Sequence, residues 1–164
     1  MHVAQLLETK AKELSDKPAF IFKEQSITFS QLRDSSFRLA DSLRNLGIKK
    51  GDKVAIYLPN WPQYLYSNLA IWCCGATAVP LDFMLTEEEL ISCISHSEAT
   101  ALIAKSKAGI SLTAIKQKCP ALKNIIVSQD RIEPFLSFEE LLDRGKNMPP
   151  EDKIQDKDYA IIFY

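Results

Sequence analysis

Glycine is scarce in this sequence, and its scarcity excludes several kinds of active site. The 164 residues contain five glycines: Gly47, Gly51, Gly75, Gly109 and Gly145. They form neither the Gly-x-Gly-x-x-Gly fingerprint of a dinucleotide site nor a loop that cradles phosphates. The Gly-x-Ser-x-Gly turn of many hydrolases is absent as well. We therefore predict no catalytic residue within this chain.

Residues that bind metals are also few. Only His2 and His96 could assist the cysteines, and a zinc site needs four ligands, usually in close pairs. No secretory signal is visible, so we predict a reducing, cytoplasmic location. We predict no metal site and interpret the cysteines as reduced thiols packed in or near helices. The cysteines lack Cys-x-x-Cys spacing and are Cys73, Cys74, Cys93 and Cys119.

No excess of charge of either sign is present. The formal net charge is −1 and the pI is about 6.1, so no nucleic-acid or membrane-surface partner is indicated. Residues 54–81 carry no charge, but Pro59, Pro62 and Gly75 interrupt the stretch. A membrane-spanning helix needs about 20 continuous apolar residues. We predict a core helix over residues 61–74 and no transmembrane segment.

Short apolar runs recur at a regular interval. They begin around Val54 ("KVAIYL"), Thr77 ("TAVPL"), Ala101 ("ATALIA") and Asn124 ("NIIVS"), 23 or 24 residues apart. Helical periodicity fills the spaces between them, which is typical of parallel βα units. Before these units, the sequence predicts a short amphipathic helix and a hairpin built from "PAFIF" and "SITF". The predicted fold class is α/β, mainly parallel βα units with an N-terminal helix and β-hairpin.

Three helix starts carry a complete capping signature. A Ser or Thr is followed three residues later by Glu or Gln at Thr28/Gln31, Thr86/Glu89 and Ser137/Glu140. In such a capping box the two residues satisfy each other's backbone N–H groups, and an apolar residue before the cap packs on one in the first turns. Gly47 ends the first of these helices, where glycine can adopt the left-handed conformation. The sequence thus predicts helices that begin after these three caps.

Four loops follow the predicted strands, and ligands of open parallel sheets bind at such carboxyl ends. The loops are "PNWPQ" (59–63), "PLDFM" (80–84), "AKSK" (104–107) and "SQDR" (128–131). Trp61 and Phe83 either line a pocket there or pack on a domain surface, and packing is the more frequent role of such residues. Glu87–Glu89 fill a first helical turn, where negative charge suits the helix dipole.

Near the end of the sequence, one polar run is followed by one apolar run. A polar run, "GKNMPPEDKIQDKD", precedes "DYAIIFY", which is typical of a loop that delivers a buried strand. We predict residues 1–144 as a first α/β subdomain, 145–158 as a polar linker and 159–164 as a strand. An unpaired strand of this kind favours self-association of the chain.

Four segments in this order resemble the opening of AMP-forming acyl-CoA synthetases of the adenylate-forming superfamily. They are "DKPAFIF", "ITFSQLRDSSFRLADSLRNLGIKKGDKVAIYLPN", "AIWCCGATAVPLD" and "LTEEELISCISHSEATALI". The resemblance covers nearly the whole chain and implies a partial N-terminal domain of the adenylate-forming fold. One departure is "PLDFM", where the family usually has Pro-Leu-Asn, so Asp82 and Phe83 alter the local loop.

The resemblance also implies a reaction for the parent protein. The family's phosphate loop, Thr-Ser-Gly-Thr-Thr-Gly, follows a strand like "YAIIFY", and Tyr164 matches the residue directly before it. The parent is expected to use ATP, Mg²⁺ and coenzyme A to convert a medium- or long-chain fatty acid first to an acyl-adenylate and then to a thioester. The chain resembles about the first third of such an enzyme. We predict that by itself it binds none of these cofactors and is inactive.

Two other functions are compatible with the sequence. One is an adenylation domain that loads an amino or aryl acid onto a carrier protein, since the acid pocket of this family lies mainly after the phosphate loop. The other is a non-catalytic α/β module that acts by interaction. The acid and the acceptor are not predicted by these residues.

Overall fold

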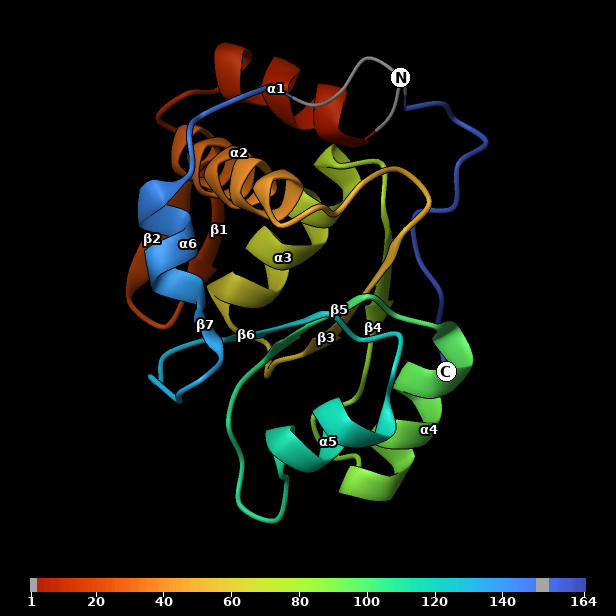
Figure 1. Cartoon of the computed structure of the whole chain (residues 1–164). Coiled ribbons are helices and arrows are strands. Elements are labelled where there is room, and N and C mark those ends of the chain that lie inside the picture. Colours follow the sequence, from red (N-terminus) through yellow and green to blue (C-terminus); the bar gives the residue numbers. More distant parts are fainter. Residues whose placement is uncertain (1–2, 150–153) are drawn as a thin grey trace.

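A parallel β-sheet lies between two layers of helices in a computed structural model that describes residues 3–149 and 154–164 (Figure 1). His2, and residues 150–153 of the predicted linker, lie outside the described residues. The described elements are, in chain order, α1 (Val3–Glu13), β1 (Pro18–Phe22), β2 (Gln25–Thr28), α2 (Phe29–Asn45), β3 (Lys53–Tyr57), α3 (Pro62–Cys73), β4 (Thr77–Pro80), α4 (Glu87–Ser97), β5 (Ala101–Ala104), α5 (Leu112–Lys118), β6 (Asn124–Val127), β7 (Leu136–Ser137) and α6 (Phe138–Arg144).

The five strands of the sheet run in the order β4-β3-β5-β6-β7, and each neighbouring pair is parallel. The four predicted strands and the α/β class are confirmed. β7 is a strand that the sequence analysis missed, because two residues are too few to show an alternating pattern. The antiparallel pairing of β1 with β2 confirms the hairpin.

Alternate residues of β3, an interior strand of the sheet, face opposite helix layers. Val54 and Ile56 pack with α1, α2, α3 and α6, while Ala55 and Tyr57 pack with α4 and α5. All four side chains are 0 % exposed. Strands covered on both faces are apolar throughout, which explains why this run looked continuous rather than alternating. No helix of the described residues is both long and apolar enough to cross a membrane.

Two of the three predicted capping boxes are complete. At α2, Gln31 donates its backbone N–H to Thr28, and the Thr28 N–H donates to the Gln31 side chain; Thr86 and Glu89 do the same at α4. At α6, Ser137 accepts the Glu140 N–H at 3.3 Å, but the Glu140 carboxylate pairs with Arg144 at 3.2 Å. The predicted bond from the Ser137 backbone N–H to the Glu140 carboxylate was wrong, because the nearby Arg144 guanidinium is a stronger partner for that carboxylate.

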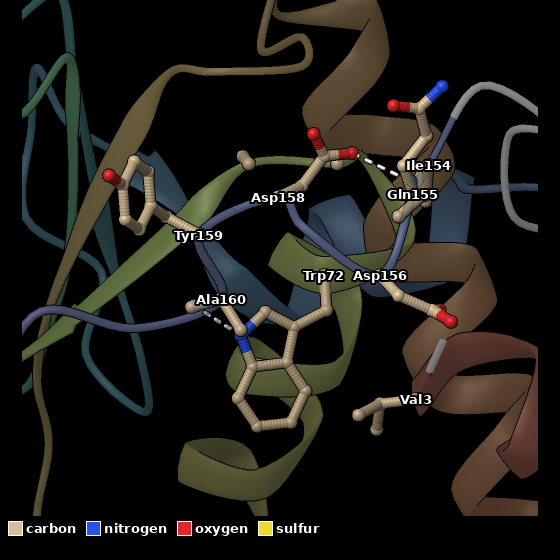
Figure 2. A pocket seen from close by; sticks show the side chains of 10 residues that line it. Val3, Trp72, Ile154, Gln155, Asp156, Asp158, Tyr159 and Ala160 are labelled. Atoms are coloured by element: carbon tan, nitrogen blue, oxygen red, sulfur yellow. Dashed lines mark hydrogen bonds between the residues drawn. The ribbon is translucent and has the colours of Figure 1, made fainter. Parts of the chain in front are cut away.

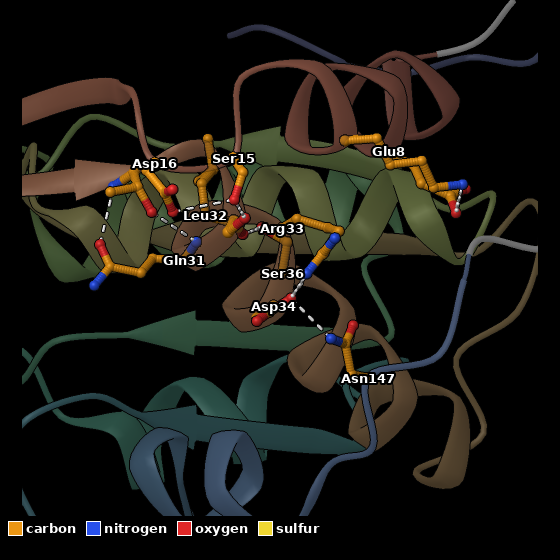
Figure 3. A network of polar contacts seen from close by, with 12 residues as sticks. Glu8, Ser15, Asp16, Gln31, Leu32, Arg33, Asp34, Ser36 and Asn147 are labelled. Carbon is orange, nitrogen blue, oxygen red and sulfur yellow. Dashed lines mark hydrogen bonds and ion pairs between the residues drawn. The ribbon is translucent and has the colours of Figure 1, made fainter.

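The start of the predicted linker packs tightly on α2. A Cβ added at Gly145 would lie 1.9 Å from the carbonyl oxygen of Arg38, so only glycine fits where α6 meets α2. The Asn147 side chain donates to the Asp34 carboxylate at 2.8 Å, and Asp34 also pairs with Arg33 (Figure 3). Gly145 is therefore buried against α2, whereas residues 146–149 are exposed and Asn147 is tied to α2 by its side chain.

The strand predicted over residues 159–164 is reduced to a single parallel bridge, between Ile161 and Ala78 of β4. Ile161 and Ile162 pack on opposite faces of the sheet, as strand residues do. Tyr159 and Phe163 are 83 % and 74 % exposed. The prediction of a buried strand is corrected here, because this segment has a neighbour on one side only.

Candidate functional site

The carboxyl ends of β3, β4, β5 and β6 lie at one edge of the sheet, as the sequence predicts for the four loops that follow them. The chain leaves β3 for β4 on one side and then crosses to β5 on the other side. Such a reversal of strand order opens a crevice where ligands of α/β proteins bind. The candidate site is therefore the carboxyl edge around β3, β4 and β5.

Tyr57 fixes the loop that follows β4. Its hydroxyl lies 3.0 Å from the carbonyl oxygen of Phe83 and 3.2 Å from that of Leu85, and it donates to them. The Phe83 ring packs on the Tyr57 ring with centroids 4.8 Å apart. Burial, and to a lesser extent the charge of Asp82, raises the pKa of Tyr57, so the phenol stays protonated as a donor. Phe83 thus has the packing role.

The lysines of the loop after β5 are occupied by the protein's own acceptors. Lys107 donates to the Phe83 carbonyl at 2.6 Å, and its ammonium lies 5.1 Å from the centre of the Phe83 ring. Lys105 pairs with the Asp130 carboxylate, which also accepts from Ser106. Hydrogen bonds from Lys105 and Ser106 lower the pKa of Asp130. These contacts tie the loops after β4, β5 and β6 together.

A groove of about 300 Å³ runs beside the end of β4. Its walls come from the β4 end, from α4 and from Tyr164; they are Pro80, Leu81, Asp82, Leu85, Glu89, Ser92, Cys93 and Tyr164. The Tyr164 hydroxyl lies 2.8 Å from Nδ1 of His96, and the two rings meet edge-on at 5.6 Å. The sequence analysis missed this contact, since 68 residues separate the partners. The predicted phosphate-loop neighbour, Tyr164, thus lies at the carboxyl edge.

Trp61 is the N-cap residue of α3, in the loop after β3, and its side chain makes no capping hydrogen bond. Two of the thiols are not activated: burial raises the pKa of Cys73, and burial and Glu89 raise that of Cys93. No disulfide forms among the cysteines, and Cys73, Cys74 and Cys119 are buried as predicted.

A second cavity, of about 240 Å³, lies near the amino end of β4 (Figure 2). Trp72, Ala76 and Ile154 contribute apolar walls, and Asp158 lies at the rim. The Asp158 carboxylate is already paired with Lys50 at 2.6 Å. This cavity is remote from the carboxyl edge where sheet ligands bind.

The lysines of the carboxyl edge already have partners within the chain. Within residues 3–149 and 154–164, no group of three or more His, Cys, Asp or Glu side chains could hold a metal ion. Lys105 is paired with the Asp130 carboxylate, and Lys107 donates to the Phe83 carbonyl. Neither ammonium group is therefore preorganised to bind phosphates. Most charged groups of this edge are paired within the chain, while the buried side-chain oxygen of Gln63 has no hydrogen-bond partner.

Comparison with known proteins identifies the family of this chain. The family model described as "AMP-binding enzyme" matches residues 7–164. The chain belongs to the AMP-binding enzyme family. This confirms the family to which the sequence resemblance pointed.

Relatives of this AMP-binding chain include CoA ligases. A medium/long-chain-fatty-acid–CoA/3-oxocholest-4-en-26-oate–CoA ligase of Mycobacterium marinum is 29 % identical over 130 residues, covering 79 % of this chain and 24 % of the relative. A long-chain-fatty-acid-CoA ligase (FadD1) from Archaeoglobus fulgidus superposes with a TM-score of 0.88 at 25 % identity, covering 100 % of this chain and 34 % of that one. The chain spans about a quarter of the length of the curated relative.

An aryl-acid enzyme shares the fold too. The anthranilate CoA ligase AuaEII, solved with anthranoyl-AMP, superposes with a TM-score of 0.89 at 21 % identity, over 96 % of this chain and 31 % of that one. At this identity the likeness concerns the fold. The adenylate-forming architecture of the chain is thereby confirmed.

Proposed function

We propose that this chain carries the opening scaffold of an AMP-forming acid:CoA ligase. In the proposed reaction a carboxylate attacks the α-phosphate of ATP, which forms an acyl-adenylate and releases pyrophosphate. The thiol of coenzyme A then attacks the acyl carbon and releases AMP. The observation that carries the proposal is the family match, which extends over residues 7–164.

The geometry of the carboxyl edge supports this proposal. Tyr164 lies beside the end of β4, so a phosphate-binding loop that follows Tyr164 would begin at the edge where sheet ligands bind. Tyr57 and Lys107 hold the neighbouring 81–86 loop through its carbonyl groups. Acyl-adenylate chemistry depends on preorganised donors and charges, which need such a rigid support. The chain itself supplies the support and, in our proposal, does not bind ATP.

For the acid, we propose a medium- or long-chain fatty acid. The names of the mycobacterial and archaeal relatives support this choice, at 29 % and 25 % identity. An aryl acid is the alternative, since the anthranilate enzyme shares the fold. The test below separates the two acids.

The experiment is acid-dependent exchange of labelled pyrophosphate into ATP, by the protein translated through and beyond the codon for Tyr164. We expect exchange with decanoate or palmitate and little with anthranilate or benzoate. Exchange with aryl acids alone would contradict the fatty-acid assignment. A reading frame that stops at Tyr164, or no exchange with any acid, would contradict the ligase proposal and favour an interaction module.

A further inference from the structure

Backbone pairing alone holds segment 158–164 weakly. The Ala78 N–H donates to the Ala160 carbonyl and the Ile162 N–H donates to the Ala78 carbonyl, both at 2.9 Å. These two bonds form the single bridge between the segment and β4. Two residues of paired backbone are few for a segment that reaches from the amino end of β4 to its carboxyl end.

Side chains from other elements supply further anchors. The indole N–H of Trp72, in the last turn of α3, donates to the Ala160 carbonyl at 2.6 Å (Figure 2). The hydroxyl of Thr77, the first residue of β4, donates to the Tyr159 carbonyl at 3.0 Å. The ammonium of Lys50 pairs with Asp158 at 2.6 Å. Three consecutive residues, 158 to 160, are thus each held by a different side chain.

The Ala160 carbonyl is the best-defined of these anchor points. It accepts from both Trp72 and Ala78, and a carbonyl oxygen has two lone pairs, so its acceptor capacity is filled. Two donors from different elements fix the direction of the carbonyl and hence the plane of the peptide. The orientation of the chain after Ala160 follows from that plane.

The far end of the segment reports whether this orientation is kept. Tyr164 reaches His96 at 2.8 Å and lines the groove at the end of β4. Only three residues separate Ala160 from Tyr164, so a rotation at Ala160 moves the Tyr164 ring. Because the His96 ring lies edge-on to Tyr164, the chemical shifts of its ring protons change when Tyr164 moves.

We infer that Trp72 and Thr77 are positioning residues that set where the chain after Tyr164 meets the carboxyl edge. Both lie near the amino end of β4, away from the site itself, and they act through segment 158–164. This inference rests on the proposed function, because it assigns to them the placement of the phosphate-binding loop. Neither residue is a catalytic residue.

The test uses NMR on the 164-residue chain. Trp72→Phe removes the indole donor and keeps an aromatic ring. We expect the Ile162 amide to exchange roughly two- to tenfold faster, the factor that one hydrogen bond contributes. The His96 ring protons shift as Tyr164 leaves, and exchange of the Ile103 amide in β5 stays unchanged. Trp61→Phe, the same change at the chain's other tryptophan, leaves Ile162 and His96 as they are.

A second pair of variants separates the hydroxyl from the shape of the side chain. Thr77→Val keeps the volume but loses the donor, and it is expected to accelerate Ile162 exchange. Thr77→Ser restores the donor and should return the exchange rate and the His96 shift toward those of the unchanged chain. If Trp72→Phe and Thr77→Val leave Ile162 and His96 unaltered, the inference is overturned. Equal acceleration at Ile103 would also overturn it, since the residues would then support only global stability.

Activity provides the functional arm. In the protein translated beyond Tyr164, Trp72→Phe should raise the KM for Mg·ATP severalfold in pyrophosphate exchange, while Thr77→Ser, which keeps its donor, should not. An unchanged KM refutes the positioning role and leaves the proposed ligase function standing. If no version exchanges pyrophosphate but Ile162 still responds to Trp72→Phe, the proposed function fails and the positioning role fails with it, while the anchoring contact itself is established.

Discussion

The five-stranded sheet and segment 158–164 are held in place by different forces. β3 has strands on both sides and helices on both faces, and its residues from Val54 to Tyr57 are 0 % exposed. The segment has one bridge, side-chain anchors and two aromatic residues, Tyr159 and Phe163, that are mostly exposed. Regions with few buried apolar contacts open locally before the whole domain unfolds. The comparison teaches that the sheet is a stable scaffold, whereas the segment depends on individual contacts.

The largest expected effect is a loss of stability of the scaffold. Gly145→Ala places a Cβ 1.9 Å from the Arg38 carbonyl oxygen, so α6 must move away from α2. We expect a loss of about 2–4 kcal/mol in the free energy of unfolding, measured by urea denaturation. Gly109→Ala is the control: its φ is +81° but nothing lies within 4 Å, so it should lose only about 1 kcal/mol. Equal losses would show that α6 and α2 are not in close contact.

A smaller effect is expected at the carboxyl edge of the scaffold. Tyr57→Phe removes the hydroxyl that donates to the carbonyls of Phe83 and Leu85. Since the ring remains in the core, the loss should be about 1 kcal/mol, again in urea denaturation. Amide exchange should accelerate in residues 81–86 more than in β5. Faster exchange throughout the sheet would contradict a local role of the hydroxyl.

Lowering the pH should loosen segment 158–164 before it affects the sheet. The Lys50 ion pair and the Gln155 N–H lower the pKa of Asp158 below its ordinary value of 3.8. The stabilisation is therefore complete above pH 3.8 and is lost as the pH falls through the lowered pKa. In an NMR titration the Ile162 amide signal should move below about pH 4, while that of Ile103 stays. Asp158→Asn should abolish this movement; a titration that persists in the variant would assign it to another group.

The smallest effect concerns association rather than stability. The exposed aromatic residues and the open side of Ile161 favour weak self-association, which light scattering should detect as a mass that rises with concentration. Phe163→Lys should reduce that rise with little change in unfolding free energy. Ile21→Lys, at another exposed apolar residue in the hairpin, should not. A strictly monomeric chain at all concentrations would contradict this prediction.

The sequence predicted those parts of the fold that depend on near neighbours. The caps Thr28 and Thr86 and their partners lie three residues apart, and the four main strands have recognisable apolar runs. What it missed depends on which of several possible partners a group takes. β7 needs β6 as a partner, and the capping role of Glu140 is lost to Arg144, four residues later. The spacing of Glu140 and Arg144 shows that an ion pair is possible, but it does not decide between that pair and the cap.

The candidate site shows the same division. The loops after the strands and the place of Tyr164 at that edge followed from the βα pattern and the family resemblance. The contact of His96 with Tyr164, and the occupation of Lys105 and Lys107 by Asp130 and the Phe83 carbonyl, arise only when distant loops meet. Spacing along the chain carries no information about these pairs.

Titration calorimetry of the 164-residue chain with Mg·ATP tests the central claim most directly. The claim is that these residues supply the scaffold of an AMP-binding enzyme and that the nucleotide contacts come from outside them. We predict no saturable heat at nucleotide concentrations up to about 1 mM, the range in which many enzymes bind their substrates. Saturable binding in the micromolar range, lost in a Lys105→Met or Lys107→Met variant, would contradict the claim.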